Sequence, residues 1–185
     1  MKPLRLFISY SHKSERALDT PPWKAELTAA LKVFTDQDLI DSWDDEAIPG
    51  GYRWFHEIKN AIHQARVAIL LLTKDALESE FILEHEFKPL SERDSHQLLV
   101  FPILCEACAW EAHPWLKRLQ IRPFEAKPLA TCSDAERAAT WRRLATEITD
   151  ELSRIALSEL PGDTAAPAEE HLYLEKFPLT RGPGL

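Results

Sequence analysis

Residues 67–72 read Val-Ala-Ile-Leu-Leu-Leu, an uninterrupted aliphatic run in the middle of the chain. A strand that is apolar at every position is covered on both faces, which is typical of a parallel sheet between two layers of helices. Two similar runs, Leu4–Ser9 and Leu98–Leu104, predict further buried strands, and Leu39–Trp43 predicts a weaker one. With a short edge strand expected near Ile121–Phe124, the sequence predicts a sheet of four or five strands.

Apolar residues recur at helical spacing in the segments between these strands. The pattern predicts helices over Trp23–Phe34, Trp54–Ala65 and Ser79–Leu90, and a long helix that starts at the capping-box sequence Ser133-Asp134-Ala135-Glu136. Strands and helices that alternate in this way form an α/β domain with a parallel sheet.

The periodicity extends over one domain and then ends. We assign residues 1–157 to this domain. Residues 158–185 contain Pro and Gly without any periodic pattern, and we predict a linker or tail that leads to a downstream sensor module.

Composition excludes several classes of protein. The 185 residues carry a formal net charge of −8, and the chain lacks the clustered Lys and Arg of a nucleic-acid surface. No apolar run approaches the ~20 residues of a membrane span, and the N-terminus lacks a signal-peptide pattern, so we expect a cytoplasmic protein with no nucleic-acid or membrane contact. The chain has five glycines, too few and too scattered for the glycine-rich phosphate loops of Rossmann and Walker sites.

The three cysteines, Cys105, Cys108 and Cys132, are too few for a disulfide scaffold. Cys105 and Cys108 have the spacing of a C-x-x-C motif, but Trp110 and Pro114 follow where a redox motif would open a helix. We therefore predict neither a metal site nor a redox site.

Four motifs, in this order along the chain, resemble those of the Toll/interleukin-1 receptor (TIR) domain family in its bacterial form. They are Phe7–Lys13 (FISYSHK), Trp43–Gly50 (WDDEAIPG), Leu70–Phe87 (LLLTKDALESEFILEHEF), and the pair Pro102–Leu104 and Cys108–Trp110 (PIL, CAW). The resemblance covers Leu4–Leu157. It implies a flavodoxin-like three-layer sandwich with a parallel sheet of four or five strands in the order 2-1-3-4-5, whose ligands bind beyond the carboxyl ends of the strands.

The resemblance also implies an activity, because many bacterial TIR domains cleave NAD⁺ between nicotinamide and ribose. The nicotinamide leaves as a neutral molecule, so a single carboxylate that stabilises the oxocarbenium-like ribose is sufficient. The matching carboxylate is Glu86. At 100° per residue it lies about 60° from the centre of the stripe formed by Leu83, Phe87 and Leu90, which predicts a partly buried side chain. Glu84, on the opposite shoulder of the helix, remains an alternative.

Several residues are expected to line the site for NAD⁺, which is a substrate here and not a bound cofactor. The turn after the first strand offers backbone N–H groups and a cation for the diphosphate. Trp43 either stacks on a ring of the substrate or lies in the core, and the resemblance implies that Phe81 lies near the reacting end. The expected substrate-binding residues are Tyr10, Ser11, His12, Lys13, Trp43 and Phe81. Trp54, in the next helix, is predicted to lie in the core.

The resemblance implies that the loop after the second strand either packs on a neighbouring TIR domain or gates the site. Its residues are Asp44, Asp45, Ile48, Pro49, Gly50 and Gly51. The resemblance implies that self-association completes or activates the site, in a setting of antiviral defence. A non-enzymatic adaptor that uses this loop for TIR–TIR contacts is the alternative function.

Overall fold

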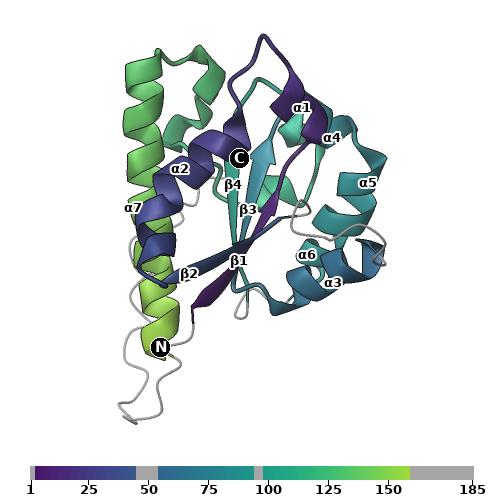
Figure 1. The fold of residues 1–185 in the computed structure, drawn as a ribbon. Helices are drawn as coiled ribbons and strands as arrows, with labels where there is room; N and C mark the ends of the chain where they lie inside the picture. Colours follow the sequence, from purple (N-terminus) through teal and green to yellow (C-terminus); the bar gives the residue numbers. More distant parts are fainter. Residues whose placement is uncertain (1–2, 45–53, 94–97, 159–185) are drawn as a thin grey trace, which may run out of the picture.

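The computed structural model describes residues 3–44, 54–93 and 98–158. It contains a parallel sheet of four strands, β1 (Leu4–Ser9), β2 (Ile40–Trp43), β3 (Val67–Leu72) and β4 (Leu99–Leu104), in the order β2-β1-β3-β4 (Figure 1). Val67–Leu72 is buried at every position, because helices cover both faces of the sheet. The predicted flavodoxin-like α/β fold is confirmed.

The strand order places a topological switch point at β1. The chain passes from β1 to β2 on one side and then returns to β3 on the other side of β1. Two neighbouring connections that leave in opposite directions cannot both cover the space above the carboxyl ends of β1 and β3, which is where ligands bind in such sheets. Ser9, the last residue of β1, pairs in register with Leu70 of β3 and therefore lies at this position.

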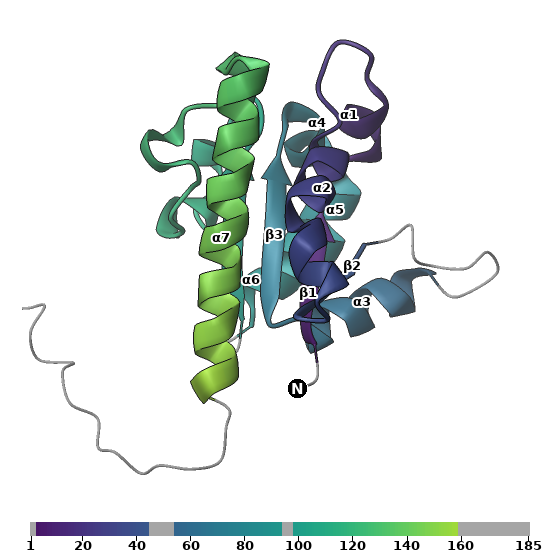
Figure 2. The same cartoon turned by 60° about the vertical axis from the view of Figure 1, so that its left-hand side comes forward.

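One face of the sheet is covered by α2 (Trp23–Asp36) and α7 (Asp134–Ser158), which we call the α2/α7 layer (Figures 1 and 2). Both helices are regular, and α7 extends along the whole height of the molecule (Figure 2). The buried residues of this layer include Trp23, Leu27, Trp141 and Ile148.

Capping fixes the beginning of α7. The Ser133 hydroxyl accepts from the backbone N–H of Glu136, and the Glu136 carboxylate accepts from the backbone N–H of Ser133. These reciprocal bonds are the capping box that the sequence predicts, and they satisfy N–H groups that the first turn of a helix leaves without partners.

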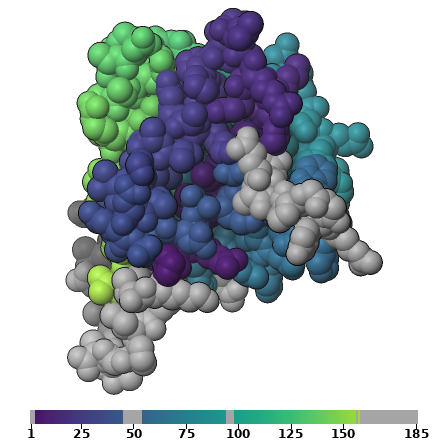
Figure 3. Space-filling view, viewed as in Figure 1, coloured from purple at the N-terminus to yellow at the C-terminus, as the bar shows by residue number. Residues whose placement is uncertain are grey.

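The other face is covered by what we call the α3/α6 layer (Figure 1). Its elements are α3 (Trp54–Gln64), α4 (Lys74–Glu78), α5 (Glu80–Ile82), a π-helical turn (Leu83–Phe87) and α6 (Lys88–Ser91). The space-filling view shows the two layers on opposite flanks, with α2 on one side and α3 to α5 on the other (Figure 3).

The structure differs from the sequence prediction in two elements. The predicted helix over Ser79–Leu90 consists of three segments, because a π-turn interrupts it. The predicted edge strand near Ile121–Phe124 is a single bridge between Ile103 and Arg122, because short 3₁₀ turns on either side, at Leu116–Arg118 and Phe124–Ala126, bend the chain away.

The remaining described elements are short. They are α1 (His12–Arg16), which follows β1, and two more 3₁₀ turns at Trp110–Ala112 and Leu129–Thr131. The predicted tail lies outside the described residues from position 159 onward. Its role as a linker stays a prediction.

Candidate functional site

A buried carboxylate lies at the carboxyl end of β1. The Glu86 side chain is buried, with a relative exposure of 6%. The hydroxyl of Ser9, which is 2% exposed, donates a hydrogen bond to Glu86 Oε2. Residues 9 and 86 are far apart in the chain, so this bond ties the end of β1 to the helix of the α3/α6 layer. A carboxylate in such surroundings interacts with a nearby positive charge more strongly than it would in water.

The π-turn explains why Glu86 is more buried than its sequence position predicts. The Lys88 N–H donates to the Leu83 carbonyl oxygen, one residue further back than in an α-helix. The wider turn brings Glu86 and Phe87 to the buried face below Ile82, while Leu83 lies only partly buried. The prediction that Glu86 lies on a shoulder of the apolar stripe is wrong for this reason: the stripe passes through Ile82 and Glu86.

Glu84 occupies a different environment on the same turn. Its carboxylate is exposed and forms an ion pair with Lys88, with 3.3 Å between Lys88 Nζ and Glu84 Oε2. Of the two carboxylates that the sequence left open, Glu86 alone lies at the edge of the sheet beside Ser9.

Two stacked aromatic pairs involve residues of the α3/α6 layer, the layer that also contains Glu86. The ring of Trp43 stacks on Phe7, with 5.6 Å between centroids, and the ring of Phe81 stacks on Trp54 at 4.4 Å. Trp54 is 43% exposed, so the prediction that it lies in the core is wrong. It begins α3, and Phe81, the ring against which it packs, is itself only partly buried.

The turn after β1 is divided between the two layers. Side chains alternate along a strand, so Phe7 and Ser9 face the α3/α6 layer, whereas the Tyr10 ring packs in the core of the α2/α7 layer. His12 lies against Tyr10, with 3.4 Å between His12 Nε2 and the Tyr10 hydroxyl, and Ser11 is buried. The Tyr10 side chain therefore does not join Glu86, and substrate contacts by Tyr10, Ser11 and His12 stay a prediction.

Lys13 is exposed and already has an anionic partner. Its ammonium group donates a hydrogen bond to Asp75 Oδ1, and this bond together with the charge of Asp75 raises the pKa of Lys13. A diphosphate would have to compete with Asp75 for this cation. Diphosphate binding by Lys13 stays a prediction.

Lys24 forms an ion pair with Asp44, the first residue of the predicted interaction loop, although no sequence motif marks Lys24 as functional. Asp44 Oδ2 lies 3.1 Å from Lys24 Nζ, and the same ammonium group lies 5.0 Å from the centre of the Tyr10 ring. Lys24 was missed because a lysine in the first turn of a helix looks like any surface residue. Ser9 was also missed, although it is the one hydroxyl that ends an apolar strand. The other predicted loop residues, Asp45, Ile48, Pro49, Gly50 and Gly51, lie outside the described residues.

The model of the TIR domain family matches residues 6–145, which is more than half of the chain. The chain belongs to the TIR domain family. The prediction of a TIR domain is thereby confirmed.

The chain is similar to three further proteins. The chain is 29% identical over 134 residues to an uncharacterized protein, y4lF, of Sinorhizobium fredii, covering 72% of this chain and 39% of that protein's length. It is similar to the TIR domain of the Toll-related receptor TRR-2 from Hydra magnipapillata, with 21% identity, a TM-score of 0.43, and coverage of 77% of this chain and 96% of that one. It is also similar to the TIR domains of the activated Roq1 resistosome, with 18% identity, a TM-score of 0.43, and coverage of 80% and 84%.

The cysteines of this TIR domain do not form a reactive pair. Burial raises the pKa of the Cys105 thiol well above its usual value, and burial raises that of Cys108 to about 11. These shifts are opposite in direction to the lowered thiol pKa that a reactive C-x-x-C motif needs. In the three described segments, no group of three His, Cys, Asp or Glu side chains could hold a metal ion, and no helix is long and apolar enough to cross a membrane.

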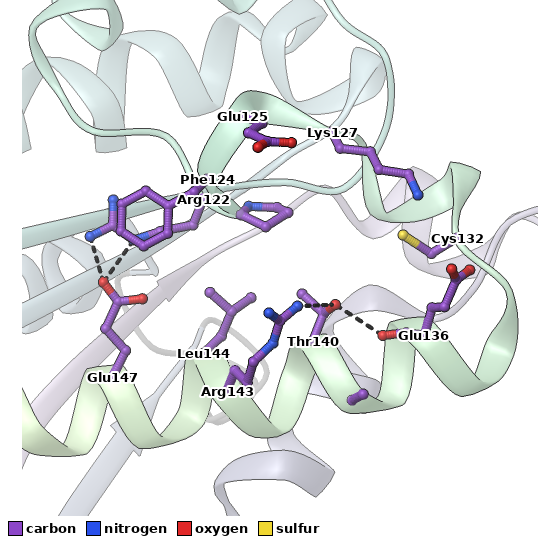
Figure 4. Close-up of a pocket in the computed structure, with 12 residues that line it drawn as sticks. Arg122, Phe124, Glu125, Lys127, Cys132, Glu136, Thr140, Arg143, Leu144 and Glu147 are labelled. Carbon is purple, nitrogen blue, oxygen red and sulfur yellow. Dashed lines mark hydrogen bonds and ion pairs between the residues drawn. The ribbon is translucent and has the colours of Figure 1, made fainter.

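A hollow lies beside α7, and Glu86 does not line it (Figure 4). It has a volume of about 550 Å³, and its wall contains an ion pair in which Arg122 Nε lies 2.7 Å from Glu147 Oε1. Phe124 covers the guanidinium of Arg122 at 4.2 Å. Two further hollows are lined by residues around Leu98–Phe101 and by residues of α2, and Glu86 lines none of the three.

Proposed function

We propose that this TIR domain is an NAD⁺ glycohydrolase in which Glu86 is the catalytic carboxylate. The observation that carries the proposal is the buried Glu86 side chain, bonded to Ser9 at the carboxyl end of β1. This is the edge and the strand end where a parallel sheet of this topology binds its ligand. A buried acidic group is uncommon in a small domain unless it has a structural partner or a function.

The chemistry fits a site with a single carboxylate. The bond between the nicotinamide nitrogen and C1′ of the ribose breaks, and its electron pair goes to the nitrogen, which leaves as neutral nicotinamide. The ribose becomes cationic, and the Glu86 carboxylate stabilises this charge in surroundings of low dielectric constant. Water then adds to C1′ and loses a proton, which gives ADP-ribose. Attack on C1′ by the adenine base in place of water gives the cyclic product.

Two aromatic pairs support the proposal by their position. The rings of Phe81 and Trp43 both lie in the α3/α6 layer, on the side of the sheet where Glu86 is found. A pyridinium ring that stacks on an aromatic face gains about 0.5–2 kcal/mol. We assign the nicotinamide to Phe81, which precedes Glu86 by one turn of the same irregular helix.

A TIR scaffold without enzymatic activity is the second candidate function. It is supported by Trp54 and Phe55, which are 43% and 40% exposed at the start of α3, immediately after the loop that contains Pro49, Gly50 and Gly51. Exposed aromatic rings are enriched at protein interfaces. In the enzymatic proposal the same surface serves self-association, which activates cleavage as part of antiviral defence.

The test measures nicotinamide release from NAD⁺ by the purified chain at high concentration and with added crowding agent. Matched variants are Glu86→Gln and Glu84→Gln, two carboxylates on the same turn that lose the same charge. We expect Glu86→Gln to lower kcat by about 100- to 1,000-fold, because the developing positive charge loses its counter-charge. Glu84→Gln should stay within about 2-fold, because its ion pair is exposed.

Two outcomes would contradict the proposal in different ways. Loss of activity in Glu84→Gln, with activity retained in Glu86→Gln, would assign the reaction to the other carboxylate. A wild-type chain that releases no nicotinamide even when clustered artificially, for example on a surface, would favour the scaffold.

A further inference from the structure

The Ser9 hydroxyl is buried next to the carboxylate to which the reaction is assigned. Ser9 is 2% exposed and Glu86 is 6% exposed, and the hydroxyl donates to Oε2. Moving a hydroxyl out of water without a hydrogen bond is unfavourable, so a serine at this position is stable only when it has a partner. Of the other β1 side chains on this face, Phe7 is buried and apolar, whereas Arg5, near the opposite end of the strand, donates a hydrogen bond to Gln64 of α3.

The hydrogen bond restricts the carboxylate in a way that packing does not. Rotation about the last side-chain bond of a glutamate is only weakly hindered, so apolar neighbours alone do not fix the plane of the two oxygens. A donor on Oε2 fixes this plane and therefore the direction in which Oε1 presents its lone pairs. Ser9 is itself held in place, because it pairs with Leu70 in the centre of the sheet.

We infer that Ser9 is a positioning residue for NAD⁺ cleavage: its hydroxyl fixes the orientation of the Glu86 carboxylate toward the ribose. This inference rests on the proposed function. It assigns to Ser9 no contact with the substrate, so its effect should be confined to the chemical step. The binding of NAD⁺, which depends on other side chains, should not change.

The experiment compares two buried serines near the carboxyl end of β1, Ser9 in the strand and Ser14 in the following helix α1. Ser9→Ala removes the donor to Glu86. The matched control Ser14→Ala removes a hydroxyl that is also buried, at 3% exposure, and that donates to Thr73 Oγ1 at 2.8 Å. Ser9→Thr restores a hydroxyl, and Ser9→Cys supplies a weaker donor of similar size. Each variant is assayed for kcat and KM of nicotinamide release and for its thermal unfolding temperature.

We expect Ser9→Ala to lower kcat by about 10- to 100-fold, the range that corresponds to a hydrogen bond to a charged group, with KM within about 2-fold. Ser9→Thr should recover most of the lost kcat, Ser9→Cys should lie between Ser9→Ala and the wild type, and Ser14→Ala should keep the kcat of the wild type. If Ser9→Ala does not fold, the other two variants decide the question. The inference then requires a higher kcat in Ser9→Thr than in Ser9→Cys.

Three results would overturn the inference. A kcat of Ser9→Ala equal to that of the wild type, in a chain where Glu86→Gln is inactive, would refute the role of Ser9 and leave the proposed function intact. An equal loss in Ser14→Ala would indicate general loosening of the sheet edge, and a rise in KM without a fall in kcat would indicate a substrate contact. Activity retained in Glu86→Gln would instead refute the proposed function itself.

Discussion

The α2/α7 layer and the α3/α6 layer cover the same sheet with different kinds of helix. In the α2/α7 layer, two long regular helices bury Trp23 and Trp141, and Glu26 of α2 joins them by accepting from Arg137 at 3.0 Å and from Trp141 Nε1 at 2.7 Å. In the α3/α6 layer, α4, α5 and α6 are short, and a π-turn interrupts the helix that contains Glu86.

Each layer contains a carboxylate, and the two carboxylates differ in burial and in hydrogen-bond partners. Glu26 is partly exposed, and its partners are an arginine and an indole N–H, which compensate its charge. Glu86 is more deeply buried, and one hydrogen bond to its carboxylate comes from the neutral hydroxyl of Ser9. π-Turns occur frequently at functional sites, where they are retained although an α-turn would be more stable. We therefore expect substitutions in the α2/α7 layer to change stability without changing activity, and substitutions around Glu86 to change activity.

The largest expected effect is on stability, in the α2/α7 layer. Trp141→Ala removes a buried indole and leaves a cavity against α2, which should lower the free energy of unfolding by about 3–5 kcal/mol. Urea denaturation followed by circular dichroism measures this change. Leu157→Ala, at a position of α7 that is 68% exposed, should change stability by no more than about 0.5 kcal/mol.

The same Trp141→Ala variant tests whether the layers are separable. Below its unfolding temperature, the rate of nicotinamide release per folded molecule should equal that of the wild type, because Trp141 lies on the face opposite Glu86. A marked fall in kcat in the folded variant would show that the layers are coupled.

The two layers also differ in how well the sequence predicts them. The α2/α7 layer follows directly from periodicity, because Trp141, Leu144, Ile148 and Leu152 recur at helical spacing and the capping box marks where α7 begins. In the α3/α6 layer, Ser79–Leu90 is predicted to be helical, but a regular period of 3.6 residues cannot place a π-turn. The burial of Glu86 was underestimated for that reason.

Contacts between distant segments were the least predictable part of the site. The choice of Glu86 came from a family resemblance, whereas its bond to Ser9 depends on β1 and the π-turn meeting in three dimensions. The ion pair of Lys24 with Asp44 has the same character. Tyr10 and Lys13 belong to one turn, but neither side chain is directed toward Glu86. Strand alternation places the Tyr10 ring in the core of the α2/α7 layer, and Lys13 pairs with Asp75.

The next largest effect is a gain in stability within the α3/α6 layer. A double variant, Glu86→Leu with Ser9→Ala, replaces a buried carboxylate and its hydroxyl partner by apolar groups. We expect it to be inactive and to be more stable than the wild type by about 1–2 kcal/mol, because groups retained for activity commonly lower stability. Glu86→Leu alone should gain less, since it leaves the Ser9 hydroxyl buried without this acceptor. A double variant less stable than the wild type would show that Glu86 is retained for stability.

The smallest effect concerns the aromatic surface of the α3/α6 layer and distinguishes two aromatic rings within it. Phe81→Leu keeps an apolar side chain but removes the ring to which we assign the nicotinamide. The stacking lost is about 0.5–1.5 kcal/mol, so KM for NAD⁺ should rise by about 2- to 10-fold, with kcat little changed. Steady-state kinetics of nicotinamide release measures both constants.

Phe55→Leu is the matched control for this change, because Phe55 contacts the same neighbour, His85, with 4.7 Å between ring centroids. It is 40% exposed on α3, and we assign it no contact with the substrate. If KM rises equally in both variants, the aromatic cluster acts as one surface, and its role is the packing of α3 against the irregular helix. If KM rises in Phe81→Leu alone, the nicotinamide ring binds at Phe81, one turn before Glu86.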